Sequence, residues 1–375
     1  MNMKKIIFFV LTVVCALTAC TDKNAYTLTG TFATKDQDGT IVYLQQLDSL
    51  FRVHGIIDSV KVENSKFVFK GIAKELPVVQ IVTVKYSVEP VEYIVEKGKI
   101  EINYDSELKA TVKGTALNDK YQQFESARDS MFAKGMSAYQ KFEDLKKSGN
   151  LTPEQFQEFN ESSTQLRDSV SKLCYDFIKP YMATPAGQYF FIDNSFYIKD
   201  DQQKDIISSA PSDFINLKYI QNLKKGVESR EATSVGKQFT DVKGFNLDGK
   251  KVSLSDYAGK GKVVLVDFWA SWCGPCVESI PDLVPVYQEY KKKGLEIVGI
   301  SLDERKEDWK KAVKDLNITW PQISNLKGWN EDCSVAYGVF AIPQTVLIDK
   351  DGKIIERNIS EDALIFKLKE LLGSK

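Results

Sequence analysis

Histidine is nearly missing from this chain of 375 residues, since His54 is the only one. Zinc and copper sites usually need two or more imidazoles unless cysteines replace them, so we expect no metal cofactor. The chain also has no excess of basic charge: it contains 50 Lys and Arg residues and 51 Asp and Glu residues, and the formal net charge is -1. The chain therefore lacks the basic character of a nucleic-acid binder. With 43% apolar residues it is typical of a globular protein.

Long hydrophobic runs are scarce, and the one at the start of the chain has a specific pattern. Residues 6–17 are apolar, follow Lys4 and Lys5, and are too few for an ordinary membrane span, as in a secretory signal. The run ends in Leu17-Thr18-Ala19-Cys20, which resembles the lipobox of bacterial lipoproteins. This implies a signal peptide over residues 1–20, lipid attachment at Cys20, and a protein anchored in the cell envelope that faces the periplasm. An ordinary cleavable signal that happens to end in cysteine is the alternative.

Residues 21–117 contain short alternations of apolar and polar side chains, which predict β-strands. The expected strands are residues 26–29, 41–44, 67–69, 78–84 and 100–102. Turn signals such as Asp38-Gly39 and Lys97-Gly98 separate them. The spacing predicts an N-terminal antiparallel β domain, either a small sheet or a sandwich.

Residues 118–230 change character, because large side chains such as Phe124 recur at helical spacing. The segment 148–150, Ser-Gly-Asn, interrupts this pattern. Thr152 and Pro153 then have the form of an N-cap followed by proline in the first helical turn. We expect a helical middle section whose role is packing or spacing.

Residues 236–375 alternate between strand and helix patterns, which predicts an α/β domain. The expected strands are residues 263–270, 295–302, 345–349 and 354–358, and the expected helices are 276–293, 306–316 and 361–372. The chain is thus expected to be multi-domain, with an antiparallel β domain, a helical section and a C-terminal α/β domain.

The apolar strand at 263–270 leads into Cys273-Gly274-Pro275-Cys276. A Cys-x-x-Cys pair at the start of a helix brings both sulfurs within bonding reach, and the unpaired N–H groups of the first turn stabilise a thiolate at the first cysteine. We expect Cys273 to attack a substrate disulfide and Cys276 to resolve the mixed disulfide. The alternatives are an inert disulfide and a zinc half-site, for which the chain offers neither a second Cys-x-x-Cys nor a nearby histidine.

The sequence Trp-Cys-Gly-Pro-Cys resembles the active site of thioredoxins, and its surroundings, including the lead-in 254–260, resemble the membrane-anchored TlpA/ResA group. The resemblance covers about residues 236–375 and implies a thioredoxin-like fold and thiol-disulfide exchange. The domain over residues 21–117 resembles the N-terminal domain of Bacteroidetes-type lipoproteins that carry such a fold. The predicted substrate-contacting residues are Trp272, Gly274, Pro275 and Ile342.

Pro343 is the second element that the resemblance assigns to the site. The run 341–345, Ala-Ile-Pro-Gln-Thr, precedes an apolar strand and is similar to the thioredoxin loop whose proline is cis and faces the Cys-x-x-Cys pair. In that loop the backbone of Ile342 would pair with an extended substrate. A plain turn proline at the start of an edge strand is the alternative.

Asp267 is the third element. Burying a carboxylate inside an apolar strand is costly unless it has a partner or a role, and burial should raise its pKa towards neutrality. Asp267 resembles the buried thioredoxin aspartate that deprotonates the resolving cysteine, here Cys276. Two departures leave the proton route open: residues 295–302 contain no lysine to pair with the acid, and Ser279 stands where ResA-type proteins carry glutamate. A solvated residue at the strand end is the alternative.

Two further cysteines, Cys174 and Cys333, lie outside the reactive pair. A lone cysteine most often behaves as a small buried hydrophobe, so we expect packing roles for both. Cys333 precedes the Pro343 strand and could also approach the site.

Together these features predict a membrane-anchored thiol-disulfide oxidoreductase that reduces exported proteins, because Gly-Pro between the cysteines and Ile342 before the proline resemble reducing thioredoxins. Its partners would be client proteins with thiols or disulfides and a transmembrane electron donor. The alternatives are a disulfide oxidase or isomerase and a partner-binding lipoprotein whose redox domain is accessory. A thiol peroxidase would carry threonine at the position of Ala270.

Overall fold

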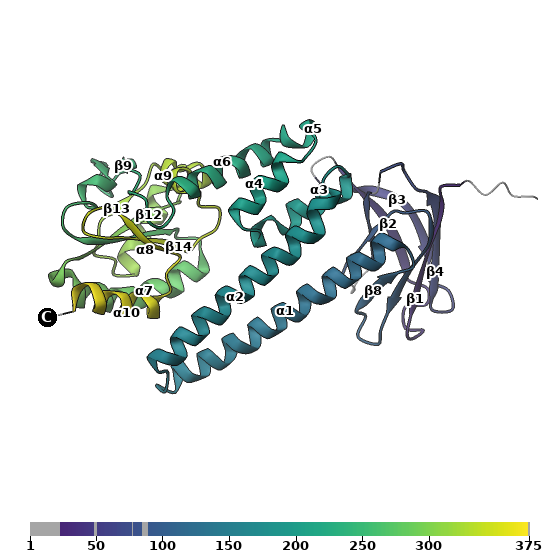
Figure 1. Cartoon of the computed structure of the whole chain (residues 1–375), viewed down its shortest axis with the longest axis horizontal. Coiled ribbons are helices and arrows are strands. Elements are labelled where there is room, and N and C mark those ends of the chain that lie inside the picture. Colours follow the sequence, from purple (N-terminus) through teal and green to yellow (C-terminus); the bar gives the residue numbers. More distant parts are fainter. Residues whose placement is uncertain (1–22, 49–50, 77, 85–88, 374–375) are drawn as a thin grey trace, which may run out of the picture. The chain divides into compact units, whose positions relative to one another are not determined.

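The computed structural model describes residues 23–48, 51–76, 78–84 and 89–373 (Figure 1). The predicted signal peptide and its lipidation site, Cys20, lie outside the described residues. The chain divides after Tyr197 into two compact units. In the described part of the chain, no helix combines the length and the apolar character needed to cross a bilayer.

A β-sandwich begins the first unit. Its strands are β1 (Ala25–Phe32), β2 (Ile41–Leu47), β3 (Val53–Lys61), β4 (Lys66–Ile72), β5 (Val79–Val84), β6 (Val91–Ile94), β7 (Gly98–Tyr104) and β8 (Ala110–Lys113). One sheet has the order β4-β1-β7-β8 and the other β3-β2-β5-β6. Strands β1, β2, β4, β5 and β7 coincide with the five predicted from alternation, so the β-rich domain is confirmed.

Pairing in the sandwich is antiparallel apart from β1 and β7, which run parallel. Side chains that alternate along the strands, such as Leu28, Ile100 and Ile102, are fully buried between the sheets. Strand β3 has the opposite character, since nearly all of its residues are exposed. It therefore carries no apolar alternation from which it could have been predicted.

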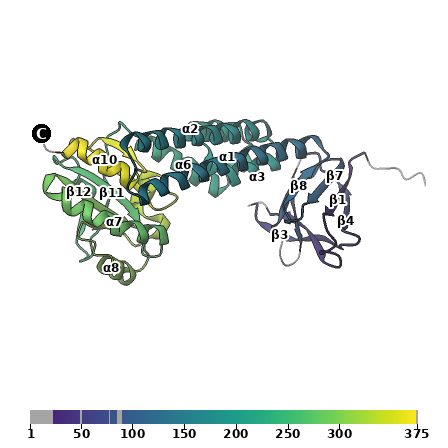
Figure 2. The same cartoon turned by 90° about the horizontal axis from the view of Figure 1, so that it is seen from below.

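Two long helices, α1 (Ala116–Lys147) and α2 (Pro153–Ile178), form an antiparallel hairpin whose members lie side by side in both views (Figures 1 and 2). The predicted break at 148–150 and the predicted N-cap are confirmed. The Thr152 hydroxyl accepts from the Gln155 N–H at 3.2 Å, and the Gln155 side chain accepts from the Thr152 N–H at 3.1 Å. Aromatic side chains join the two helices, with Phe124 and Phe177 stacked at 4.4 Å between ring centroids.

Four further helices follow: α3 (Pro185–Asn194), α4 (Asp200–Ser208), α5 (Ser212–Ile215) and α6 (Lys218–Ala232). Helix α3 belongs to the first unit, whereas α4 to α6 belong to the second. The helical section expected over residues 118–230 is therefore divided between the two compact units.

The rest of the second unit is an α/β domain around a five-stranded sheet of order β13-β12-β11-β14-β15. The strands are β11 (Val263–Trp269), β12 (Leu295–Ser301), β13 (Gln322–Ile323), β14 (Gln344–Ile348) and β15 (Ile354–Arg357), with a separate hairpin of β9 (Lys243–Phe245) and β10 (Lys251–Ser253). The helices are α7 (Gly274–Tyr290), α8 (Lys306–Asp315), α9 (Asp332–Tyr337) and α10 (Glu361–Leu372). Strand β11 is central and wholly buried, parallel to β12 and antiparallel to β14. The predicted α/β domain is confirmed.

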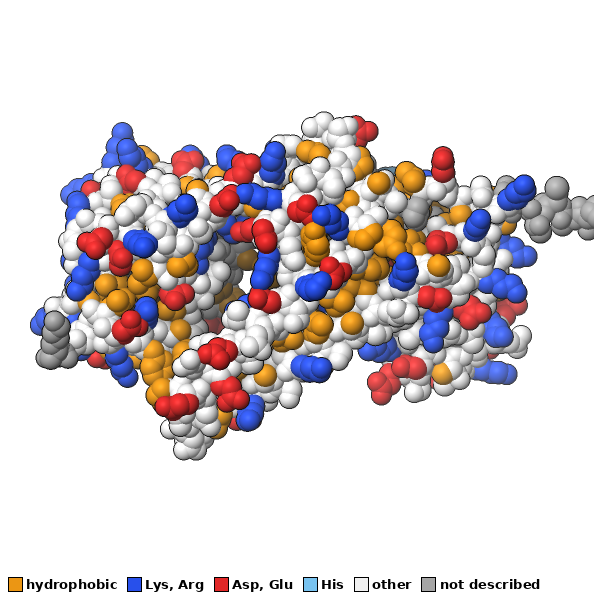
Figure 3. Space-filling model, in the orientation of Figure 1, with side chains coloured by type: hydrophobic (Ala, Val, Ile, Leu, Met, Phe, Trp, Pro, Cys, Tyr) orange, Lys and Arg blue, Asp and Glu red, His pale blue; other side chains and the backbone are white. Residues whose placement is uncertain are grey.

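The surface carries charges of both signs. On the face drawn in Figure 3, Lys and Arg side chains are interspersed with Asp and Glu side chains. This mixture matches the near-zero net charge of the chain.

Candidate active site

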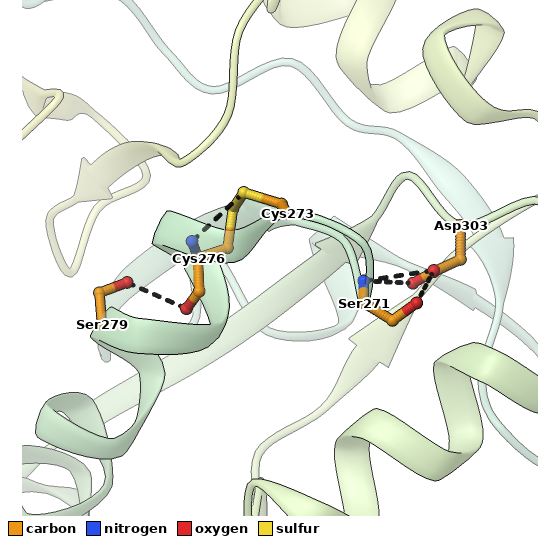
Figure 4. The surroundings of a disulfide bond; sticks show 5 residues. All are labelled: Ser271, Cys273, Cys276, Ser279 and Asp303. Atoms are coloured by element: carbon orange, nitrogen blue, oxygen red, sulfur yellow. Dashed lines mark hydrogen bonds between the residues drawn. A yellow bond between two sulfur atoms is a disulfide. The ribbon is translucent and has the colours of Figure 1, made fainter.

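The two cysteines of the Cys-x-x-Cys pair lie where β11 leads into α7 (Figure 4). Cys273 is the N-cap of α7, and its sulfur accepts a hydrogen bond from the Cys276 N–H at 3.2 Å. The two form a disulfide with a Cα–Cα distance of 5.3 Å. Both are buried, at 6% and 1% exposure. The helix therefore presents its unpaired N–H groups to the first sulfur, as an activated nucleophile requires.

The residues around the disulfide are more accessible than the sulfurs. Trp272, Gly274 and Pro275 are exposed, and Ile342 is half-buried, so each of the predicted substrate contacts has surface available. A Cβ built at Gly274 would meet no atom within 4 Å. Trp272 is 52% exposed and lies 6.0 Å, centroid to centroid, from the indole of Trp329.

The peptide bond between Ile342 and Pro343 is cis. Pro343 is exposed and lines a pocket of about 230 Å³ together with Asp267 of β11 and Ser279 of α7. Asn358, in the loop before α10, and Glu361, the first residue of α10, line the same pocket. The structure thus brings the predicted proline and aspartate to one cavity beside the helix that carries the cysteines, while their catalytic roles remain predictions.

Asp267 is only 4% exposed and sits among apolar residues of β11. Burial raises the pKa of Asp267 to about 7, because the carboxylate loses the water that would stabilise its charge and none of the described residues compensates for that loss. Asp267 is thus a buried acid and not a solvated strand-end residue. Near neutral pH such a group exchanges a proton readily, as a general base must.

Comparisons with known proteins identify relatives of the C-terminal part of this chain. Residues 235–357 match the AhpC/TSA family and residues 26–121 match a domain of unknown function, DUF4369. A thiol-disulfide oxidoreductase ResA from Bacillus thuringiensis is 36% identical over 126 residues, which are 34% of this chain and 70% of the relative. The protein of the same name from Bacillus subtilis is 31% identical over 127 residues, 34% of this chain and 68% of the relative. This chain belongs to the ResA-like thiol-disulfide oxidoreductases.

A solved thiol-disulfide oxidoreductase from Bacteroides fragilis is also similar to this oxidoreductase. It is 36% identical, with a TM-score of 0.35, and the match covers 36% of this chain and 100% of that chain. The thioredoxin domain of an oxidoreductase from Bacteroides vulgatus is 35% identical, with a TM-score of 0.35, over 37% of this chain and 98% of that chain.

Asp303 is a residue of the site that sequence reasoning missed. It follows β12, is 1% exposed, and accepts hydrogen bonds from the backbone N–H and the hydroxyl of Ser271 (Figure 4). The Ser301 hydroxyl donates to the same carboxylate at 2.8 Å. The available signal was its position, since an acid directly after a buried strand beside β11 lies at the edge of the sheet where the Cys-x-x-Cys turn begins.

In the part of the chain that the structure describes, two cysteines lie outside the disulfide. Cys174 and Cys333 are fully buried and form no disulfide. Burial raises the pKa of Cys174 to about 11 and that of Cys333 further, which keeps both protonated. Cys333 packs in the core of the α/β domain. Over the residues that the structure describes, no cluster of His, Cys, Asp and Glu is arranged to hold a metal ion.

Proposed function

We propose that this oxidoreductase is a lipid-anchored, periplasm-facing reductant of disulfides in exported proteins, recharged by a transmembrane electron donor. The observation that carries the proposal is the Cys273–Cys276 disulfide at the N-terminus of α7, in the same domain as a buried acid, Asp267, whose pKa burial raises to about 7. The export and anchoring rest on the pattern that ends at Cys20, and the direction on the resemblance to reducing thioredoxins.

In the proposed cycle the reduced Cys273 thiolate attacks one sulfur of the client disulfide. A bond forms between Cys273 and the client, and the second client sulfur leaves as a thiolate that takes up a proton. Cys276 then loses its proton to Asp267, and its thiolate attacks the Cys273 sulfur. This second exchange forms the Cys273–Cys276 disulfide and releases the first client sulfur, so that the client gains two electrons and two protons.

The pocket beside Asp267 supports a route for the proton to leave. Among the described residues no lysine pairs with Asp267, and the polar residues that share its cavity are Ser279, Gln344, Thr345, Asn358, Ser360 and Glu361. A general base must release its proton to solvent after each turnover. Water in a cavity with such a lining would connect the buried acid to solvent.

Trapping tests the exchange and identifies the client. In a Cys276→Ser variant, the mixed disulfide between Cys273 and the client cannot be resolved and should accumulate in cells. Cys273→Ser is the matched control and should trap nothing, because the attacking sulfur is gone. Equal yields of trapped protein from the two variants would contradict the assigned order of attack.

A redox titration tests the direction. A reductant should have a potential near that of thioredoxin, about -270 mV, whereas an oxidant would lie towards about -120 mV, the value of DsbA. For the anchor, the full chain should incorporate labelled palmitate. The incorporation should be lost in Cys20→Ala and retained in Cys15→Ala, whose cysteine lies within the apolar run.

A further inference from the structure

Helix α6 lies outside the segment that matches the AhpC/TSA family, yet its side chains reach the chain segment that leads to Pro343. Arg230, near the end of α6, donates a hydrogen bond from Nη1 to the backbone carbonyl of Gly338 at 3.2 Å. The rest of its guanidinium is held by Asp200 of α4, with Nη2 to Oδ1 at 2.7 Å and Nε to Oδ1 at 3.0 Å. Arg230 is therefore fixed from one side and holds a backbone carbonyl on the other.

The same arginine lies over the ring of Phe340, which is 51% exposed. Its guanidinium carbon lies 5.4 Å from the centroid of the Phe340 ring, within the range of a cation–π contact. The ring rests directly on Gly226 of α6, where any Cβ would overlap ring atoms. Gly338 has a φ of +62°, and a Cβ there would collide with the carbonyl oxygen of Gly226. Two glycines thus let the helix and the segment 338–340 approach closely.

Arg357 of β15 makes a second connection next to this contact. Its Nη1 donates to the carbonyl and the hydroxyl of Thr233, directly after α6, at 2.9 and 2.6 Å. Its Nη2 donates to the carbonyl of Tyr337 at 2.8 Å. The end of α6 and residues 337–338 at the end of α9 are consequently bound to one another through two arginines.

Phe340 stands three residues before Pro343, and Ile342 is the residue whose backbone is expected to pair with the client. An extended client gains affinity and alignment from such backbone pairing only where the loop is already fixed. A small disulfide compound has no peptide backbone to pair with the loop, so its reduction does not depend on the loop being fixed.

We propose that α6 belongs to the exchange machinery, with Arg230 as a positioning residue that fixes residues 338–340 and, through them, the client-pairing backbone of Ile342. The inference rests on the proposed reduction of protein disulfides. It assigns to the helix before the thioredoxin-like fold a part in recognising the client polypeptide, and it places the start of the functional unit near Asp200.

The test compares a protein disulfide with a small one. The full chain, purified in detergent, is assayed with insulin and with 5,5′-dithiobis(2-nitrobenzoate). Arg230→Met should raise KM for insulin about three- to tenfold, with kcat changed far less, and should leave the rate with the small disulfide within about twofold. The control is Lys204→Met, which removes the neighbouring α4–α6 ion pair with Glu231. Lys204 makes no hydrogen bond to the described residues 338–340, so this variant should change neither assay.

Asp200→Asn gives a second, milder variant, because Asp200 is partly exposed and serves to hold Arg230. Its KM for insulin should shift in the same direction as that of Arg230→Met, by a smaller factor. Equal losses with both disulfides, or no change with insulin in either variant, would overturn the positioning role. If the wild-type chain reduces neither disulfide, the proposed function fails and the positioning role fails with it.

Discussion

The carboxylate of Asp303 holds Ser271 at three points: the Ser271 N–H lies 3.2 Å from each carboxylate oxygen, and the Ser271 hydroxyl lies 2.5 Å from Oδ1. Ser271 stands two residues before Cys273, so the end of β12 fixes the turn that delivers the first sulfur to α7. This acceptor is 1% exposed, and a buried donor that loses its acceptor bears the full cost of its lost hydration.

Asp303→Ala should destabilise the α/β domain by about 2–3 kcal/mol, because it leaves buried donors of Ser271 and Ser301 without an acceptor. Urea unfolding followed by tryptophan fluorescence measures this directly, since all five tryptophans lie beyond residue 268. Ser271→Ala is the control. It retains the backbone bond to Asp303 and should cost about 1 kcal/mol. Equal costs for the two variants would show that the carboxylate does not hold the turn.

Asp267→Asn should slow resolution of the mixed disulfide and remove its dependence on pH near 7. The reason is that burial raises the pKa of Asp267 to about 7, so that the carboxylate able to accept the Cys276 proton forms only as the pH rises through that value. Stopped-flow measurement of client release between pH 5 and 9 gives the profile. A variant that keeps the wild-type profile would exclude Asp267 as the base.

The same substitution should also change how stability depends on pH. The folded-state pKa of Asp267 lies above the value of 3.8 for an unperturbed aspartate, so the unfolded chain releases the proton first and the folded state loses stability as the pH rises from about 4 to 7. Asp267→Asn should therefore gain stability relative to the wild type across this range, by on the order of 2–4 kcal/mol, and no more above it. A constant difference between pH 4 and 8 would contradict the burial argument.

A similar dependence of stability on pH is expected for the first unit, where Glu125 of α1 is the titrating group. Burial, followed by the nearby acids Asp129, Glu92 and Asp193, raises its pKa to about 7 despite the ion pair with Arg128. The first unit should lose stability as the pH rises from about 4.5 to 7, and Glu125→Gln should reduce that loss. Far-UV circular dichroism during urea unfolding is the suitable probe, because this unit contains no tryptophan. An identical pH profile in the variant would contradict the prediction.

Thr152→Ala should lower the stability of the first unit by about 1 kcal/mol, since Thr152 caps α2 through the Gln155 N–H. Thr164→Ala, an exposed position within the same helix, is the matched control. Alanine has the higher helix propensity there, so this variant should be neutral or slightly stabilising. Equal losses from both substitutions would show that the cap contributes nothing specific.

Patterns that lie within a few residues of one another predicted much of this protein. The apolar run of β11, the Cys-x-x-Cys pair after it and the Thr152 cap each express a local rule, and the structure contains all three. The predicted helix 361–372 has the same bounds as α10. Strands with alternating burial were equally visible, because one face of each lies in the core.

The parts that escaped prediction depend on residues far apart in the chain. The parallel pairing of β1 with β7 joins segments that no local signal connects. Asp303 was not predicted, because it meets Ser271 only when β12 pairs with β11 in the folded sheet. The contact of Arg230 with Gly338 spans more than a hundred residues and rests on two glycines, which in a sequence suggest only turns or flexibility.

Gly274 has one consequence for how this enzyme could diverge. With no atom near the place where its side chain would begin, a substitution between the two sulfurs requires no repacking of the surrounding core. Divergence at this position would therefore change the surface that an approaching molecule meets beside the disulfide and would leave the packing of the core unchanged.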